Sequence, residues 1–361
     1  MPTPNASELT LQRRRILLVT TLVATSLALA DCGSKRQPAT VAAPETAAVT
    51  ASGETTAVAT ANADAADDPA IWRNAADPAA SLIIGTDKKA GLYVYGLDGK
   101  VRDFIDAGRV NNVDLIAHAG RIIVAASDRN DEANARIALF ALDSATAKLA
   151  PLGSVAGGAG EAYGICLYDG ADGLGAFIVL KDGTINQVAL DLSGATPAGK
   201  TVRTLKLATQ SEGCVVDPRT SRLYVAEEDA GLWRFDARAG SPTTATKIAG
   251  TDVSKLVADA EGVALAPEGP GNGGYVVVSS QGDNAYAVYR LADDAYVGRF
   301  RIGKGKLGAT EETDGIEIAM GSFGADYPDG LFVAQDGENA PAAQNFKLVS
   351  WADIKAALGL K

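Results

Sequence analysis

Histidine, cysteine and large aromatic residues are scarce in this chain of 361 residues, which has 1 His, 3 Cys, 8 Phe and 3 Trp. Zinc, copper and non-haem iron sites usually need imidazole or thiolate ligands, so the composition argues against these metals. The single histidine, His118, precedes Ala119-Gly120 rather than the R-x-P of histidine acid phosphatases. We interpret it as a structural or surface residue.

Several catalytic motifs are also absent. The sequence has no C-x-x-x-x-x-R phosphate loop, no G-x-S-x-G elbow and no Walker A loop, which argues against cysteine phosphatase, Ser-His-Asp hydrolase and P-loop chemistry. Positive charge is in short supply, with a formal net charge of −11. This balance argues against nucleic-acid binding, which needs a basic surface. An acidic protein acting on a phosphate ester would also need positive charge from another source.

The N-terminal segment is typical of an export signal. Arg13–Arg15 precede an apolar run from Ile16 to Ala30, which is too short for a comfortable membrane span. We predict a signal peptide over residues 1–31 and an Ala/Thr/Pro-rich linker over residues 32–62. Cleavage fits the A-x-A site before Asp31, and Leu29–Cys32 also resembles a lipoprotein box, which predicts a lipid on Cys32. We therefore expect an exported protein, either a periplasmic, membrane-anchored lipoprotein or a secreted one.

Two further cysteines, Cys166 and Cys214, each lie in an apolar, strand-like run. This setting favours buried free thiols, although an oxidising compartment would also permit a disulfide between them.

The remaining residues, 63–361, repeat one local pattern six times: an apolar strand, a polar turn and a second strand. The paired runs are 82–85 with 92–95, 122–125 with 137–140, 176–179 with 185–188, 223–226 with 232–235, 275–278 with 286–289, and 331–334 with 346–349. A unit of about 50 residues is the size of a propeller blade, so we predict an all-β, six-bladed β-propeller, with a β-sandwich as the alternative. Helix is expected only near 351–360. The six charged turns should meet at one end of the central channel.

Acidic residues gather in short motifs, most of them beside glycine or between apolar strands. These motifs are NADAADDPAIW (whose acids are Asp64, Asp67 and Asp68), NNVDL, QSEGC, AEEDAG, ADAEGV, EETDGI and AQDGEN. Carboxylate oxygens with nearby carbonyls suit calcium, which takes six to eight oxygen ligands. Basic residues lie in three of the turns, at Lys88, Lys89, Arg129 and Lys181. Beside bound calcium they would complete a surface that binds oxyanions.

These motifs resemble those of the bacterial β-propeller phytases. Asp64–Trp72 is close to the signature D-A-x-D-D-P-A-x-W, and Asn111–Asp114 matches N-N-x-D. Ala226–Asp229 and Val333–Asn339 are further likenesses, and the matches follow the family order as far as Trp351. The chain departs from the family pattern at Ile116, where a basic residue is usual, and at Asp182, where a glutamate is usual.

The resemblance implies a calcium-dependent phosphomonoester hydrolase that acts on phytate or calcium-phytate through a metal-activated water, as a monomer. It implies that several calcium ions are bound by Asp67, Asp68, Asp114, Glu212, Glu228, Asp259, Glu261, Asp314, Gln335 and Asp336. It implies that phosphate is bound by Lys88, Lys89, Arg129, Tyr163 and Lys181, and that Lys88, Arg129 and Glu228 serve catalysis. A calcium-dependent lactonase or esterase and a non-catalytic envelope-binding propeller are the alternatives.

Overall fold

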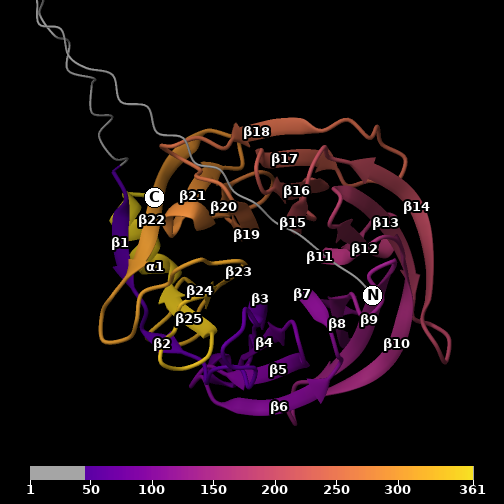
Figure 1. Ribbon diagram of the computed structural model, residues 1–361, viewed down its shortest axis with the longest axis horizontal. Helices are drawn as coiled ribbons and strands as arrows, with labels where there is room; N and C mark the ends of the chain where they lie inside the picture. The colour runs from indigo at the N-terminus through magenta and orange to yellow at the C-terminus, as the bar shows by residue number, and fades with distance from the viewer. Residues whose placement is uncertain (1–44, 361) are drawn as a thin grey trace, which may run out of the picture. The chain divides into compact units, whose positions relative to one another are not determined.

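A computed structural model describes residues 45–360, and almost all of this part of the chain is β-strand. The predicted signal peptide, Cys32 and the first part of the predicted linker lie outside the described residues. The strands form six sheets arranged as blades around a central axis (Figure 1). The prediction of an all-β, six-bladed β-propeller is therefore confirmed.

The blades follow one another along the chain, and each blade begins with the strand nearest the axis. Blade 1 contains β3 (Ala66–Trp72), β4 (Leu82–Asp87), β5 (Gly91–Gly96) and β6 (Val101–Asp106). Blade 2 contains β7 (Val110–His118), β8 (Arg121–Asp128), β9 (Asn134–Asp143) and β10 (Lys148–Ala159). Blade 3 contains β11 (Ala162–Gly170), β12 (Gly173–Leu180), β13 (Thr184–Asp191) and β14 (Ala198–Lys206).

The second half of the ring repeats this plan. Blade 4 contains β15 (Ser211–Asp217), β16 (Arg222–Glu227), β17 (Gly231–Asp236) and β18 (Thr246–Gly250). Blade 5 contains β19 (Ala260–Pro267), β20 (Gly274–Ser280), β21 (Ala285–Arg290), β22 (Tyr296–Gly303) and β1 (Ala47–Thr50). Blade 6 contains β23 (Ile316–Met320), β24 (Gly330–Asp336), β25 (Asn345–Ser350) and β2 (Gly53–Glu54). Two short 3-10 helices lie at Pro78–Ala80 and Gln281–Asp283.

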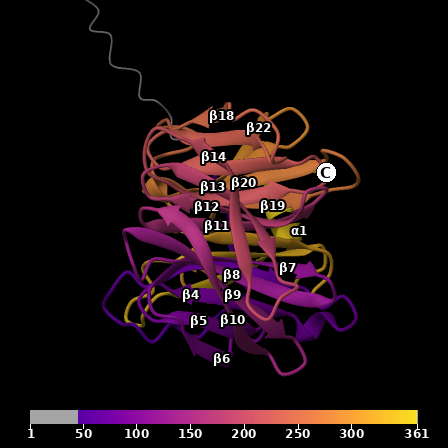
Figure 2. The same cartoon turned by 90° about the vertical axis from the view of Figure 1, so that its right-hand side faces the viewer.

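The six predicted hairpins are the middle two strands of each blade. Their apolar runs are buried on both faces: Ile83 and Ile84 are neighbours on β4, yet they belong to two apolar clusters on opposite sides of blade 1. Six such clusters fill the spaces between adjacent blades, and the side view shows the sheets stacked against one another (Figure 2). A strand covered by a sheet on each side needs a continuous apolar run, as the sequence has.

The N-terminal strands complete the last two blades, which corrects the predicted linker. β2 pairs antiparallel with β25 through Gly53 and Leu348, and β1 pairs parallel with β22. Both strands lie within residues 32–62, so the linker ends earlier than predicted and the propeller includes these residues. No sign of these two strands is visible in the sequence, because an outermost strand buries little apolar surface and the Ala/Thr-rich segment has no apolar periodicity. Their hydrogen bonds join the two ends of the described chain and close the ring.

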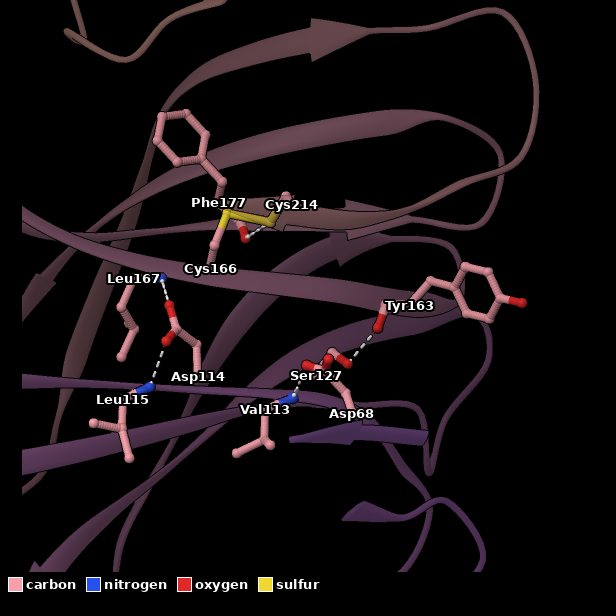
Figure 3. The surroundings of a disulfide bond; sticks show 10 residues. All are labelled: Asp68, Val113, Asp114, Leu115, Ser127, Tyr163, Cys166, Leu167, Phe177 and Cys214. Atoms are coloured by element: carbon pink, nitrogen blue, oxygen red, sulfur yellow. Dashed lines mark hydrogen bonds between the residues drawn. A yellow bond between two sulfur atoms is a disulfide. The ribbon is translucent and has the colours of Figure 1, made fainter. Parts of the chain in front are cut away.

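Cys166 on β11 and Cys214 on β15 form a disulfide, with an S–S distance of 2.14 Å and a Cα–Cα distance of 5.8 Å (Figure 3). The interpretation as free thiols is therefore wrong. Each cysteine lies on the innermost strand of its blade, and the apolar cluster between blades 3 and 4 holds both side chains. The bond joins adjacent blades close to the axis.

The predicted C-terminal helix is present as α1 (Trp351–Leu358). The Ser350 side chain accepts a hydrogen bond from Asp353 N–H at its start, and Gly359 ends it in the left-handed conformation. Within residues 45–360 there is no helix with the length and apolar character to span a membrane.

Candidate metal and phosphate site

A β-bulge begins the innermost strand in five of the six blades. In blades 1 to 5 the pairing with the second strand shifts register within the first few residues. The residues in these bulges are Asp67 and Asp68, Asn111 and Asn112, Tyr163, Glu212 and Gly213, and Glu261 and Gly262. A bulge redirects side chains locally, and here the bulges hold part of the motifs that resemble the phytases, including Asp67, Asn111 and Glu212. Because the first three strands of each blade are antiparallel, the turn between the second and third strands lies at this same end.

The glycines that follow the acidic residues allow adjacent blades to approach closely. A Cβ atom on Gly213 would lie 2.4 Å from the Glu261 carbonyl oxygen, and one on Gly262 would lie 2.6 Å from that of Asp314. Any larger residue would push the innermost strands apart. The acid-glycine pairs of the sequence therefore place an acidic side chain at the axis and leave room for the next blade.

Three glutamates from different segments meet at this end of the axis. Glu212 comes from the bulge of β15, Glu261 from that of β19, and Glu228 from the turn between β16 and β17. One carboxylate oxygen of each lies within 4.8 Å of the others, and all three residues are buried. Such spacing matches oxygens that share one cation.

Lys88 lies in a second group of carboxylates. Its Nζ is 2.8 Å from Asp64 Oδ1, 3.0 Å from Asp67 Oδ2 and 3.0 Å from Asp314 Oδ2. Gln281 also donates a hydrogen bond to Asp314 at 2.6 Å. The predicted phosphate ligand Lys88 therefore contacts the predicted metal ligands directly. Its ammonium supplies one positive charge to a group with three negative ones.

Burial and mutual repulsion disfavour ionisation of these acids. Burial, with the charges of Asp67 and Asp314, raises the pKa of Glu212 well above its usual range. Burial and the charge of Glu212 do the same to the pKa of Glu261. For Asp314, burial raises the pKa to about 7 despite the opposing effect of Lys88. The side chains alone leave this cluster short of positive charge.

Several oxygens of the cluster lack a partner although they are buried. They are Asp67 Oδ1, Glu228 Oε1, Glu261 Oε2 and the amide oxygen of Asn111. An orphaned buried acceptor is costly, so such groups indicate an ion or water that satisfies them. The atoms of this cluster that could bind a metal are carboxylate and amide oxygens, with no imidazole or thiolate among them, and calcium prefers such oxygen ligands. The residues present therefore fit calcium.

A cationic group lies beside the carboxylates. Arg129, in the turn between β8 and β9, lies with its guanidinium carbon 5.9 Å from the centre of the Tyr163 ring. Lys181, in the turn between β12 and β13, has its Nζ 5.0 Å from the same ring centre. Tyr163 also accepts a hydrogen bond at its hydroxyl from Gln210, at 3.3 Å. Three of the predicted phosphate ligands, Arg129, Tyr163 and Lys181, thus lie close together.

Two predicted metal ligands are engaged by the backbone. Asp114 accepts hydrogen bonds from the N–H groups of Leu115 and Leu167 at 2.6 and 2.7 Å (Figure 3). Asp68 accepts one from Val113 N–H at 3.0 Å. Burial raises the pKa of Asp114 to about 6. In Asp68, burial and the charge of Asp67 raise the pKa well above its usual range.

Gln335 and Asp336, at the end of β24, also have partners of their own. The Gln335 amide accepts from Asp314 N–H at 2.9 Å and donates to Ala66 C=O at 3.1 Å, so it joins blade 6 to blade 1. Asp336 is buried and forms an ion pair with Lys347 at 3.2 Å. Gln335 holds the backbone of the site together, and Asp336 belongs to a separate ion-pair group.

Two predicted site residues lie at its edge. Lys89 is exposed in the turn after β4. Asp259 is half-buried immediately before β19, and burial together with the charge of Asp229 raises its pKa.

Three residues of the site were not predicted. Asn111 donates a hydrogen bond to Glu212 at 2.7 Å, and its signal was its place in the N-N-x-D motif. Glu161 forms an ion pair with Arg129 at 3.4 Å. Glu317, on β23, has its pKa raised well above the usual range by burial and by Asp114. The last two stand outside the acid-glycine motifs, so no local pattern marked them.

Comparisons with known proteins agree with these motifs. Residues 15–361 match the model of a family described as Phytase. The chain is 40% identical over 331 residues to the 3-phytase of Bacillus subtilis (strain 168), covering 86% of this chain and 85% of that protein. Among solved structures, a chain of the crystal structure of the mitotic checkpoint complex is similar, with a TM-score of 0.47 and 13% identity over 92% of this chain and 89% of that chain. That similarity is too weak to bear on fold or function.

Proposed function

Since this chain belongs to the phytase family, we infer that it is a phytase that hydrolyses phytate, and we propose that calcium ions are its cofactor. The family match and the 3-phytase relative support the substrate. One observation supports the calcium proposal. Buried carboxylate oxygens without hydrogen-bond partners lie beside Arg129 and Lys181, the cations that would bind phosphate.

Glu212, Glu228 and Glu261 would hold a calcium ion between them, with Asp67 and Asp314 close by. Calcium, when bound, supplies positive charge to the phosphate oxygens and lowers the pKa of water. Asn111 donates a hydrogen bond to one carboxylate oxygen of Glu212 and so fixes the orientation of the second oxygen, which would bind the ion. This arrangement also explains how a chain with a net charge of −11 can accept a polyanion.

The cationic group would bind the phosphate that is removed. The Arg129 guanidinium can contact two phosphate oxygens at once, and Lys181 adds a point charge. Burial, with the charges of Glu212 and Glu261, raises the pKa of Tyr163 far above its usual range. Its hydroxyl therefore stays protonated and can donate to a phosphate oxygen. Together these groups stabilise the charge that spreads over the phosphoryl oxygens in the transition state.

The test is phosphate release from phytate in calcium and in excess chelator. We expect activity only with calcium, and we expect Glu261→Gln to raise the calcium concentration that gives half-maximal rate. Glu268→Gln is a matched control, because Glu268 lies just beyond the far end of the same strand and pairs with Lys355 at 3.7 Å. Full activity of the wild-type protein in chelator would refute the calcium dependence. Cleavage of a lactone without phosphate release would favour a lactonase.

We also propose that the chain is exported. The basic and apolar N-terminal segment supports this, and so does the Cys166–Cys214 disulfide, because such bonds persist in oxidising compartments. We expect Cys32→Ala to abolish membrane association and leave catalysis unchanged, as measured by cell fractionation and phosphate release. A wild-type protein found only in the soluble fraction would refute lipidation.

A further inference from the structure

Glu161 lies between two of the cations that would bind phosphate. It occupies the short connection between β10 and β11, two residues before Tyr163. One carboxylate oxygen is 3.4 Å from Arg129 Nη1, and the other is 4.0 Å from Lys181 Nζ. Within residues 45–360, no other carboxylate forms an ion pair with Arg129 or Lys181.

The backbone holds Glu161 in this place. Its carbonyl accepts a hydrogen bond from Lys181 N–H at 3.1 Å, and the neighbouring Gly160 N–H donates to Ala133 C=O at 2.8 Å. Glu161 is thus attached to the turn of blade 2 through Gly160 and to that of blade 3 through Lys181. Arg129 is almost fully buried, whereas the Lys181 side chain is 41% exposed.

Two cations beside one aromatic ring repel each other, and an anion that attracts both offsets this repulsion. The Glu161 carboxylate is that anion, and the two cations that it contacts lie 5.9 and 5.0 Å from the centre of the Tyr163 ring. The group keeps a net positive charge, because one carboxylate faces two cations. A phosphate oxygen can therefore still be bound once the cations are aligned.

We propose that Glu161 is a positioning residue that aligns Arg129 and Lys181 so that both approach one phosphate group. The proposal rests on the proposed function, since it takes these cations as phosphate ligands. It assigns Glu161 no contact with the reacting atoms.

The first test compares Glu161→Gln with Glu132→Gln. Glu132 is matched in charge, lies in the adjacent turn and pairs with Arg109 at 2.7 Å on the surface. In calcium, Glu161→Gln should lower kcat/KM for phytate about tenfold, because misplaced binding groups cost catalytic efficiency. It should weaken the binding of inorganic phosphate as well. Its melting temperature and the calcium concentration for half-maximal rate should stay close to wild type, and Glu132→Gln should leave all four quantities unchanged.

The second test is a double-mutant cycle with Lys181→Met. If Glu161 acts through Lys181, the fold-loss in kcat/KM of the double variant should be smaller than the product of the fold-losses of the two single variants. Independent losses, or an equal loss in Glu132→Gln, would overturn the proposal. A lower KM in Glu161→Gln would also overturn it, because the carboxylate would then compete with phosphate.

Failure of the proposed function would look different. In that case the wild-type protein would release no phosphate from phytate even with calcium. The positioning role would then be judged from calorimetric binding of inorganic phosphate to the calcium-loaded wild type and Glu161→Gln. Equal phosphate affinities would refute it.

Discussion

At the scale of single residues, the site divides into side chains that would touch phosphate and side chains that would hold metal. Arg129 belongs to the first group, because its partners are the Tyr163 ring and Glu161 rather than the carboxylate cluster. Asp314 belongs to the second, because it lies within the carboxylate cluster. Lys88 and Gln281 contact it, and its charge helps to raise the pKa of Glu212. Substitution at the two positions should therefore produce different defects.

Arg129→Lys should lower catalytic efficiency without changing the calcium requirement. Lysine cannot contact two phosphate oxygens at once, so the loss should be about 1.5–3 kcal/mol of transition-state stabilisation. This corresponds to roughly a tenfold to hundredfold drop in kcat/KM.

Asp314→Asn should instead raise the calcium concentration needed for activity, because it removes one charge from the cluster.

The measurement is a calcium titration of phosphate release for both variants. Excess calcium should restore part of the rate of Asp314→Asn and none of the rate lost by Arg129→Lys. The opposite pattern would mean that the phosphate and metal roles are exchanged.

At the scale of elements, the innermost strands supply part of the site and also the contacts between blades. Strand β15 illustrates this: Glu212 and Cys214 are two residues apart, the first in the carboxylate cluster and the second bonded to β11. Strand β11 in turn carries Tyr163 and Cys166. The disulfide therefore holds together two neighbouring strands, one of which carries Tyr163 of the cationic group near its start and the other Glu212 of the carboxylate cluster.

Loss of this disulfide should lower stability. It closes a loop with a sequence separation of 48, and bonds of this kind contribute about 2–4 kcal/mol. We expect a reducing agent to lower the free energy of unfolding by about this amount in denaturant titrations. The double variant with Cys166→Ala and Cys214→Ala should start from the lower stability and no longer respond to the reducing agent. An identical response in the variant would show that the Cys166–Cys214 bond is not the source of the effect.

At the scale of the whole molecule, one end of the propeller concentrates buried negative charge. Burial holds the pKa of Asp314 at about 7 and that of Asp114 at about 6, above the ordinary value near 4. Between about pH 4 and pH 7 the folded chain thus keeps protons that the unfolded chain has lost. Stability must fall as the pH rises through this window, because the unfolded state then binds fewer protons.

The calcium-free protein should show this dependence most clearly. In excess chelator, the melting temperature should fall as the pH is raised from 5 to 7.5. Calcium should raise the melting temperature, most strongly at the higher pH, because it binds the ionised carboxylates of the folded state. A melting temperature in chelator that equals the value in calcium at pH 7.5 would contradict a metal site built from these acids.

Much of the fold could be predicted because its repeating unit is local. The apolar strand, polar turn and second strand of each hairpin lie within about twenty residues, so the pattern is visible in the sequence itself. The closure of the ring could not be predicted, because Gly53 pairs with Leu348 across nearly the whole chain. Residues 47–54 have no apolar pattern that announces this pairing.

The amino-acid sequence alone specifies most residues of the site, because each acid-glycine motif belongs to one blade and repeats at the spacing of the blades. Their pairing depends on the folded ring. Lys88 meets Asp314 across 226 positions, and Glu161 meets Arg129 and Lys181 through turns of different blades. Cys166 likewise meets Cys214 only because β11 and β15 are neighbours in the ring. Side-chain partners at this end of the axis follow from the bulges and the order of the blades, which are properties of the closed ring and not of any one segment.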